Sequence, residues 1–425
     1  MYKTELKGGD FANKHKSFIF TGNKYLCTGC GACTQVCNHN ALKMSPDNEG
    51  FLYPNIDKEK CVECGLCEKV CPVAGTKTEN QYDNQRCYVA TTKHEEYYME
   101  SASIGICTML SEYVLSNGGC VFGVCLDENN WTAYHIAVES ADDLPRIRNS
   151  KYLQSDTKNT FSDVKSLLNN GNTVLYIGTP CQIAGLKSFL RKTYNNLYTI
   201  DLICHGVFSP MLMPYEVKYW EEIFKGRLFN FRFRSKRVYR HSNGGMVNFD
   251  LEKNGKTIHI ERFAGSSPTY RCYAYSGDGF NYNQRPSCYT CHFRAEKRYA
   301  DITIGDPWFI DNKIIKNSLL TTNSIRSLYS VNTEQGEKLV EHIKQYLIEE
   351  ELNVSDAFCQ PATKSEVRQM PKARKELFAC LKTEEYGSLV ERLLNCDLKK
   401  AHQRFHRKYQ LSCIKRRVKE ILKWK

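Results

Sequence analysis

The chain has 425 residues, 41% of them hydrophobic and 12% aromatic, which is enough for two or three domains with real cores and excludes global disorder. No run of about 18 or more apolar residues occurs, so a transmembrane helix is not expected. The N-terminus also lacks the apolar stretch of a signal peptide, and we therefore expect a cytoplasmic protein. The 21 cysteines, odd in number and partly in C-x-x-C pairs, indicate metal or redox chemistry rather than disulfides.

Two segments near the N-terminus repeat each other. CTGCGACTQVC begins at Cys27, CVECGLCEKVCP begins at Cys61, and each has the spacing C-x2-C-x2-C-x3-C. Bacterial ferredoxins hold two [4Fe–4S] clusters with this run, the fourth cysteine of each run binding the other cluster. Zinc sites usually have two C-x2-C pairs and a longer spacer, which fits this doubled pattern poorly. We therefore assign two clusters, one to Cys27, Cys30, Cys33 and Cys71, and one to Cys61, Cys64, Cys67 and Cys37.

The middle of the chain alternates strand and helix patterns. The expected strands are 120–126, 173–178 and 197–203, and the expected helices are 103–119, 161–171 and 182–192. Such units predict a parallel sheet, in which ligands bind at the carboxyl ends of the strands. Cys181 and Cys204 each follow one of these strands, so they are candidates to complete a site with the C-x-x-C pair Cys288 and Cys291.

The alternative for Cys181 and Cys204 is that they are ordinary buried cysteines, which are common. Cys272, sixteen residues before Cys288, is a weaker spare ligand. The remaining cysteines lack partner spacing and are interpreted as core or surface thiols.

A family resemblance extends this interpretation. The segments SASIGICTMLSEYVLSNGGCVFG, RNSKYLQS, GTPCQIAGLKSFL, DLICHGVFSP and SCYTCHFRAEKRYADITIGDPWF follow one another in order. Together they resemble the coenzyme F420 hydrogenase/dehydrogenase beta-subunit family, from about Cys87 to about residue 312. The resemblance implies FAD, a [4Fe–4S] cluster and often a fused ferredoxin domain. By this resemblance, a third cluster is held by Cys181, Cys204, Cys288 and Cys291.

Candidate flavin residues lie in three turns. Ser101, Ser103 and Gly105 open a helix whose free N–H groups can accept a pyrophosphate, although Ile104 replaces a glycine that is usual in the family. The other candidates are a hydroxyl and a cation, Ser150 and Lys151, and the turn beside Cys181, formed by Gly178, Thr179 and Pro180. No G-x-G-x-x-G follows a strand, so a Rossmann nicotinamide site is not supported.

Basic segments complete the chain. Arg232 and Arg234 alternate with phenylalanines, which predicts a strand whose basic face is either solvated or binds an anionic cofactor. Asn254–Gly255 predicts a hairpin turn, and 336–350 an amphipathic helix. The basic tail 399–425, with an apolar stripe, fits partner docking, a solvated helix or peripheral contact with an anionic membrane; nucleic acid is not expected. The stripe consists of Leu411, Ile414, Val418 and Ile421.

The predicted fold class is α/β with α+β. A two-cluster ferredoxin domain (1–76) and a linker (77–86) precede a mixed or parallel-sheet flavin domain (87–330) and a helical, basic C-terminal region (331–425). The predicted function is an iron–sulfur flavoprotein oxidoreductase that passes electrons between ferredoxin-type clusters and a two-electron acceptor or donor through FAD.

Two other functions stay open. One is an electron-transfer subunit that serves a redox partner protein, for example in cell-envelope polysaccharide biosynthesis, and has no small-molecule substrate of its own. The other is a non-redox role with structural or sensing clusters. The sequence specifies neither the acceptor, nor the direction of electron flow, nor any catalytic residue.

Overall fold

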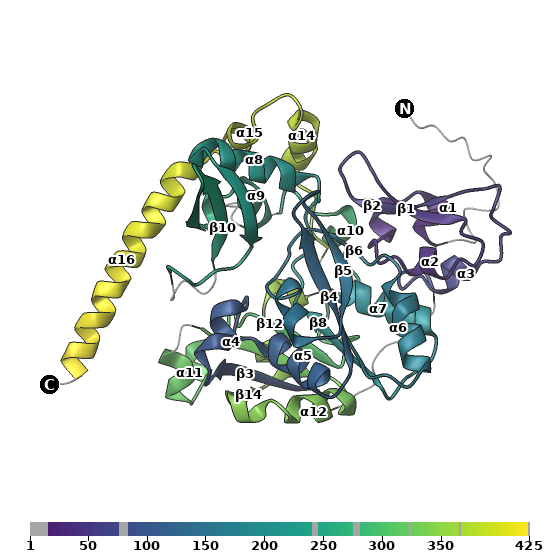
Figure 1. The fold of residues 1–425 in the computed structure, drawn as a ribbon, viewed down its shortest axis with the longest axis horizontal. Coiled ribbons are helices and arrows are strands. Elements are labelled where there is room, and N and C mark those ends of the chain that lie inside the picture. Colours follow the sequence, from purple (N-terminus) through teal and green to yellow (C-terminus); the bar gives the residue numbers. More distant parts are fainter. Residues whose placement is uncertain are drawn as a thin grey trace.

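A small N-terminal unit lies beside a larger α/β body, and the last helix runs outward from the opposite side of that body (Figure 1). The structure is a computed structural model that describes residues 16–75, 84–239, 245–274, 281–322, 325–364 and 367–423. No helix in these ranges combines the length and apolarity that crossing a membrane requires.

The N-terminal unit is built around the two cysteine runs. Its strands β1 (Leu42–Pro46) and β2 (Leu52–Ile56) pair antiparallel. The short helices α2 (Ala32–Gln35) and α3 (Leu66–Lys69) each follow a left-handed glycine, Gly31 at φ 78° and Gly65 at φ 72°. Because glycine has no Cβ, the chain turns sharply there and wraps each run around a small space. The unit also contains α1 (Phe18–Thr21) and a 3-10 turn (Lys24–Leu26).

The body is organised by one nine-stranded sheet in the order β14-β3-β13-β12-β8-β7-β4-β5-β6. Its central neighbours β4, β7, β8 and β12 run parallel, whereas β3, β13 and β14 at one edge are antiparallel. The predicted mixed or parallel sheet is therefore confirmed, and the three predicted strands are β4, β7 and β8. The strands are β3 (Arg86–Thr92), β4 (Cys120–Asp127), β5 (Thr132–Val138), β6 (Ser155–Asp156), β7 (Val174–Ile177), β8 (Leu197–Leu202), β12 (Ile302–Gly305), β13 (Ser327–Val331) and β14 (Leu347–Leu352).

Helices cover both faces of this sheet. α5 (Ile106–Ser116) and α12 (Glu334–Glu341) pack into one apolar core, and α6 (Thr160–Asn169) and α7 (Pro180–Leu190) into another. The second core also contains Cys30, Val36 and Val70 of the N-terminal unit, so the two parts share buried apolar surface. The predicted helix at 103–119 begins only at Ile106, after Gly105 at φ 90°. Ile104 is fully buried in the first core, which explains a large residue at that turn.

A second, three-stranded sheet carries the predicted hairpin. β10 (Met246–Lys253) and β11 (Lys256–Phe263) pair antiparallel across Asn254 and Gly255, both at positive φ, and β9 (Arg227–Arg232) lies on the other side of β10. The other helices of the body are α4 (Glu95–Glu100), α8 (Leu212–Phe224), α9 (Pro268–Ala274), α10 (Pro286–Tyr289) and α11 (Ser318–Thr322).

The prediction of a helical region at 331–425 is wrong for its first part, which also contains strands. Residue 331 ends β13, and α12 stops at Glu341, well inside the helix expected at 336–350. The following Leu347–Leu352 forms β14 because it pairs antiparallel with β3, whose backbone groups on that side would otherwise lack partners. The region is helical only after β14, with α13 (Val354–Ala357), α14 (Lys372–Cys380), α15 (Tyr386–Leu394) and α16 (Leu398–Lys423).

Candidate metal centres

The first cysteine set lines one cavity in the N-terminal unit. Three members come from the first run and one, Cys71, comes from the second, after α3. Their charges are coupled: burial first, then the neighbouring thiolates of the set, raise the pKa of Cys33. The structure thus brings together the four residues that the spacing assigned to one cluster, namely Cys27, Cys30, Cys33 and Cys71.

The second set lines a separate cavity of the same unit. It takes Cys37 from the first run and three cysteines from the second, Cys61, Cys64 and Cys67. Cys64 is exposed, whereas Cys30 of the first set is buried. The second cavity is therefore nearer to solvent, and the first is nearer to the body.

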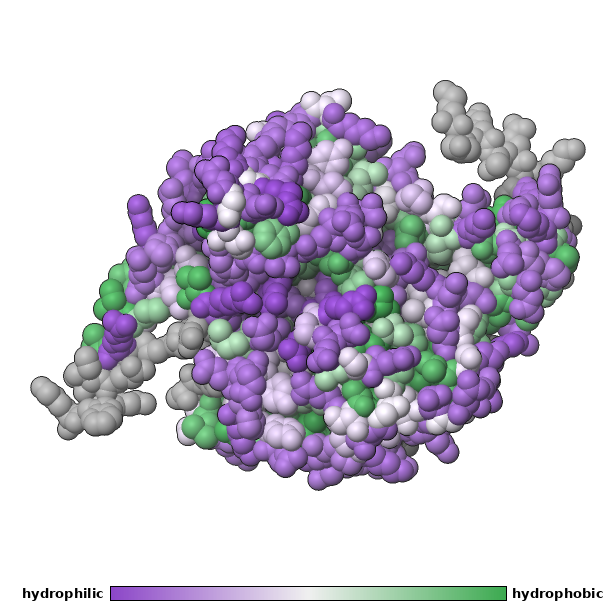
Figure 2. All heavy atoms as spheres, viewed as in Figure 1, coloured by the Kyte–Doolittle hydropathy of each residue, from purple (hydrophilic) through white to green (hydrophobic). Residues whose placement is uncertain are grey.

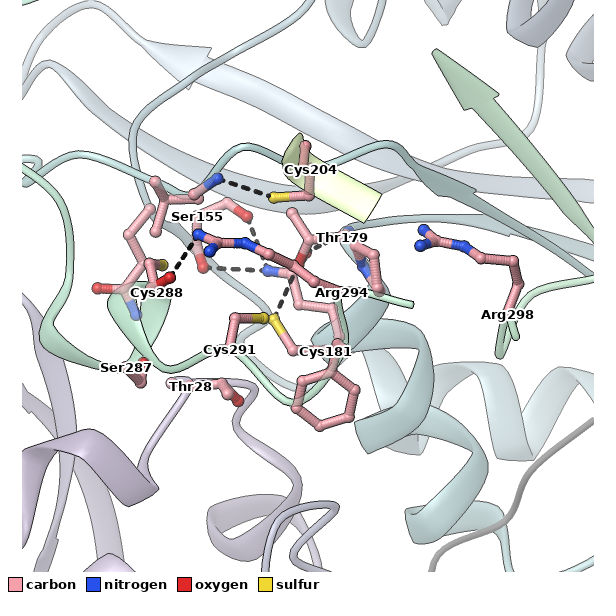
Figure 3. Close-up of a pocket in the computed structure, with 18 residues that line it drawn as sticks. Thr28, Ser155, Thr179, Cys181, Cys204, Ser287, Cys288, Cys291, Arg294 and Arg298 are labelled. Carbon is pink, nitrogen blue, oxygen red and sulfur yellow. Dashed lines mark hydrogen bonds between the residues drawn. The ribbon is translucent and has the colours of Figure 1, made fainter. Parts of the chain in front are cut away.

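The third set comes from the body, and its members line a single cavity of about 620 Å3 (Figure 3). Cys181 lies in the first turn of α7, and Cys204 lies two residues after β8. Cys288 lies in α10 and Cys291 just beyond it. Burial, followed by the charge of Cys291, raises the pKa of Cys181, and burial followed by Cys288 raises that of Cys204. Cys272 packs instead among apolar residues of α14 and α15, so it is not at this cavity.

The donor atoms of these sets can be compared with what an iron–sulfur cube needs. Within the described ranges, no three His, Cys, Asp or Glu side chains lie close enough to hold one metal ion. In a [4Fe–4S] cube each thiolate binds a different iron, so the four sulfurs surround a space rather than a point. Four thiols around each of three cavities are the donor set that such a cube needs.

Two arginines that the sequence analysis missed stand at the third cavity. Arg298 is buried and donates to Asp201 at 3.1 Å and to the carbonyl of Leu202 at 2.9 Å. Arg294 donates to the carbonyl of Cys288. Burial raises the pKa of Cys288 and the charge of Arg294 opposes this shift, whereas Arg298 is ion-paired with Asp201. The basic residues that follow the C-x-x-C pair in the sequence were the available signal.

The first and third cavities share a wall. Thr28 and Gly29 line both of them. Helix α7 also packs closely against Cys30 of the first set. The contact is at Gly185, where an added Cβ would be only 2.9 Å from the Cys30 sulfur. Because Cys181 lies in the first turn of the same helix, α7 touches both the first and the third cysteine sets.

Buried polar contacts hold the N-terminal unit in this position. Arg285, fully buried, donates to the carbonyls of Cys27 and Leu52 at 2.8 and 2.9 Å and to Gln154 at 3.1 Å. Arg374 of α14 forms a two-pronged ion pair with Glu49. These contacts fix the wall between the cavities.

The candidate flavin residues do not meet at one place. The Ser101 hydroxyl bonds Thr108 at 3.2 Å, and Gly105 is packed against Tyr97. Lys151 is half-buried, and its ammonium donates to the carbonyls of Arg146 and Arg148.

The remaining candidates lie at two different cavities. Thr179 and Pro180 line the cysteine cavity, where Thr179 caps α7, and Gly178 precedes them at the end of β7. Ser150 lines neither the cysteine cavity nor the one described next, and Ser103 lines the latter.

Ser103 opens onto a cavity of about 440 Å3 beyond the end of β12. Arg234, Asp306, Trp308 and Arg326 also line it. Arg234 and Asp306 form an ion pair at 2.7 Å; burial opposes ionisation of Asp306, but Arg234 outweighs it and keeps the pKa low. The strand predicted to carry both Arg232 and Arg234 ends at Arg232 as β9, and Arg234 lies beyond it, buried at this cavity.

Lys236 also lines this cavity, and it holds the Ser103 segment in place. Its ammonium donates to the carbonyls of Tyr98, Ser101 and Ser103 at 2.6–2.8 Å, which holds the turn between α4 and α5. Burial lowers its pKa to about 7. Neither Lys236 nor Arg326 was singled out from the sequence, because each stands outside any motif.

His205 directly follows Cys204 of the third set, after the end of β8. Burial lowers the pKa of His205 to about 4, and the charge of Asp306 opposes this shift. Asp306 lines the cavity at Ser103, so this electrostatic interaction connects a residue of that cavity with the neighbour of Cys204.

Comparison with known families agrees with this arrangement. Residues 171–355 match the profile of the C-terminal part of the coenzyme F420 hydrogenase/dehydrogenase beta chain, and residues 26–74 match a 4Fe-4S dicluster domain. The chain therefore combines a 4Fe-4S dicluster domain with a domain of the coenzyme F420 hydrogenase/dehydrogenase beta-subunit type. All eight N-terminal cysteines lie in the dicluster match, and all four cysteines of the third cavity lie in the beta-subunit match. Of the flavin candidates, Ser101, Ser103, Gly105, Ser150 and Lys151 lie outside both matches.

Two relatives of this beta-subunit-type chain are oxidoreductases or their subunits. The coenzyme F420-dependent sulfite reductase of Methanocaldococcus jannaschii is 23% identical over 245 residues, which cover 55% of this chain and 36% of that protein. One subunit of the F(420)H(2) dehydrogenase of Methanosarcina mazei is 22% identical over 205 residues, 44% of this chain and 57% of that relative. The chain thus spans about one third to just over half of these relatives.

Among solved structures, one chain of the F420-reducing [NiFe] hydrogenase complex from Methanosarcina barkeri matches with a TM-score of 0.39 and 13% identity. The match covers 76% of this chain and 94% of that one.

Proposed function

We propose that this chain is an iron–sulfur flavoprotein oxidoreductase that passes electrons between its ferredoxin-type clusters and a two-electron acceptor or donor through FAD. The observation that carries the proposal is the series of three four-cysteine cavities, of which two share the wall Thr28–Gly29. The names of the relatives support an oxidoreductase or a component of one.

Different residues would bind the cofactors, exchange electrons with a partner and position the cavities. When bound, [4Fe–4S] clusters supply one-electron steps and FAD supplies the two-electron step. The twelve cysteines of the three cavities hold the clusters, and the exposed edge at Cys64 is the point of exchange with a redox partner. Arg294 would stabilise negative charge at the third cavity, and Thr28–Gly29 keeps the first and third cavities adjacent.

We assign the flavin to the cavity at Ser103. It offers the groups that a flavin nucleotide needs: Arg326 for a phosphate, the half-exposed ring of Trp308 for stacking, and the Ser103 segment held by Lys236. Asp306 of this cavity also interacts electrostatically with His205, the residue that follows Cys204 of the third set. In contrast, Lys151 and Ser101 are engaged with the protein and are not free to contact a ligand.

Replacing Arg326 by glutamine is expected to weaken FAD retention by about tenfold or more, because a charge-assisted hydrogen bond to phosphate is lost. Arg326 otherwise makes a hydrogen bond to Asn312, so the fold should persist. Flavin released by heat and iron per chain are both measured after anaerobic purification. Iron should stay unchanged, and R227Q, which removes an exposed ion pair to Glu252, should retain both cofactors. Equal flavin content in R326Q and wild type would place the flavin elsewhere.

The second function, an electron-transfer subunit without its own substrate, is favoured by the dehydrogenase relative, which is one component of a larger enzyme. A turnover assay on the isolated chain distinguishes the enzyme from the electron-transfer subunit. The enzyme proposal expects the isolated, loaded chain to reduce a small two-electron acceptor such as coenzyme F420 with reduced viologen as donor. Viologen oxidation only in the presence of a partner protein would favour the electron-transfer role.

A further inference from the structure

The C-terminal helix α16 has two halves with different surroundings. Its first half is attached to the second sheet: the rings of Phe405 and Phe263 stack with centroids 4.5 Å apart, and Tyr409 packs edge-on against Tyr239 at 4.9 Å. The Tyr239 hydroxyl and the His406 ring lie 2.8 Å apart in a hydrogen bond. After Tyr409 the helix stands clear of the body (Figure 1).

The free half exposes aliphatic side chains. Leu411, Ile414 and Val418 are 59%, 58% and 48% exposed, and Figure 2 shows apolar surface on this projecting helix. At 3.6 residues per turn these three positions fall within about 60° of one another. Positions 405 and 409, which contact the body, fall on the roughly opposite side of the helix. The aliphatic stripe therefore faces away from the protein.

Positive charge is concentrated on the same helix. Residues 398–423 contain ten lysines and arginines and one glutamate, in a chain of net charge +12. By helical position, the exposed Arg404, Arg407, Lys408 and Lys415 flank the aliphatic stripe within about 90°. In the described part of the helix the one ion pair joins Lys400 to Asp397, so these four cations are available to an external anion.

We propose that α16 docks the protein on an anionic lipid surface. A helix that presents aliphatic side chains flanked by cations along one outward face lies in the boundary between head groups and acyl chains. The aliphatic side chains enter that boundary, and the lysines and arginines contact lipid phosphates. The free half spans roughly 20 Å without a groove of its own, which suits a flat surface better than a folded partner.

Flotation of the full, iron-loaded chain with vesicles tests the proposal. Binding is expected to vesicles with about one third phosphatidylglycerol in phosphatidylcholine, and not to phosphatidylcholine alone, and it should weaken as salt is raised. Each removed cation should lower the partition coefficient about fivefold, so K408Q/K415Q loses roughly 25-fold. L411S/I414S/V418S should also release the protein. The matched surface variants K338Q/K382Q and L319S/V367S should bind like wild type.

Three results would overturn the proposal. They are equal binding to neutral and anionic vesicles, no binding to either, and a self-association in light scattering that the α16 variants abolish. The last result would make the stripe an interface between copies of the chain. Unchanged iron content in each variant shows that it is folded, so a loss of flotation reports on the helix itself.

Discussion

Replacing Cys204 by serine is expected to lower the iron content of the chain by about four atoms, from about 12 toward about 8. Cys204 reaches the third cavity from the end of β8, and it shares that cavity with three cysteines from α7 and the α10 segment. A hydroxyl is a poor substitute for a thiolate as an iron ligand, so we expect the cube to be lost when only three of its sulfur ligands remain. Iron and acid-labile sulfide per chain, measured without oxygen, give the count.

Two other cysteines provide matched controls. Cys107 is a buried core thiol, and burial raises its pKa to about 12 without any partner thiol. Cys272 was a spare ligand on spacing alone but packs against α14 and α15. C107S and C272S should therefore keep about 12 irons. Full iron in C204S, or a loss of four irons in C272S, would show that the cavity does not hold the third cluster.

The second large effect is expected at Arg285. Its guanidinium is buried between the N-terminal unit and the body, bonds two carbonyls and Gln154, and stacks 4.0 Å from the ring of Tyr53. R285M removes these three hydrogen bonds, of which only that to Gln154 has a second donor, the Leu52 N–H, and each hydrogen bond to a charged group is worth about 1.5–3 kcal/mol. We expect a loss of about 3 kcal/mol or more in the free energy of unfolding, measured by anaerobic denaturant titration.

The same variant should slow electron transfer inside the chain. Arg285 bonds the carbonyl of Cys27 and precedes Cys288 by three residues, so it fixes the first cavity relative to the third. Stopped-flow mixing with reduced viologen should show slower reduction at the body for R285M and an intermediate rate for R285K, which keeps the charge but not the fork of donors. The exposed R146M is the control. If R285M had the wild-type free energy of unfolding and the wild-type rate of reduction, Arg285 would not fix the first cavity relative to the third.

The sequence alone predicted the cysteine sets because their spacing is short and specific. The exchange of fourth ligands between the runs also follows from spacing, and the two N-terminal cavities contain those two sets. Cys181 and Cys204 were predictable from a more general rule: both follow parallel strands, and β7 and β8 are neighbours, so their carboxyl ends share one edge of the sheet.

The features that could not be predicted depend on contacts between residues that are distant in sequence. Residues 347–352 are helical by periodicity, yet they form β14 because β3, more than 250 residues earlier, offers an unpaired edge. The flavin candidates failed to converge for a similar reason. The Lys151 ammonium is bonded to nearby carbonyls, whereas the Ser103 hydroxyl donates to the carbonyl of Arg326, which lies more than 220 residues later, just before β13. No local pattern marks such a pairing.

The count of iron and labile sulfide in the wild-type chain tests the central claim most directly. The claim is that three cysteine cavities, not two, carry [4Fe–4S] clusters and lead from the ferredoxin unit to a flavin. We predict about 12 irons and 12 sulfides per chain, together with FAD released by heat. About 8 irons in fully loaded protein would contradict the claim, because Cys181, Cys204, Cys288 and Cys291 would then surround no cluster.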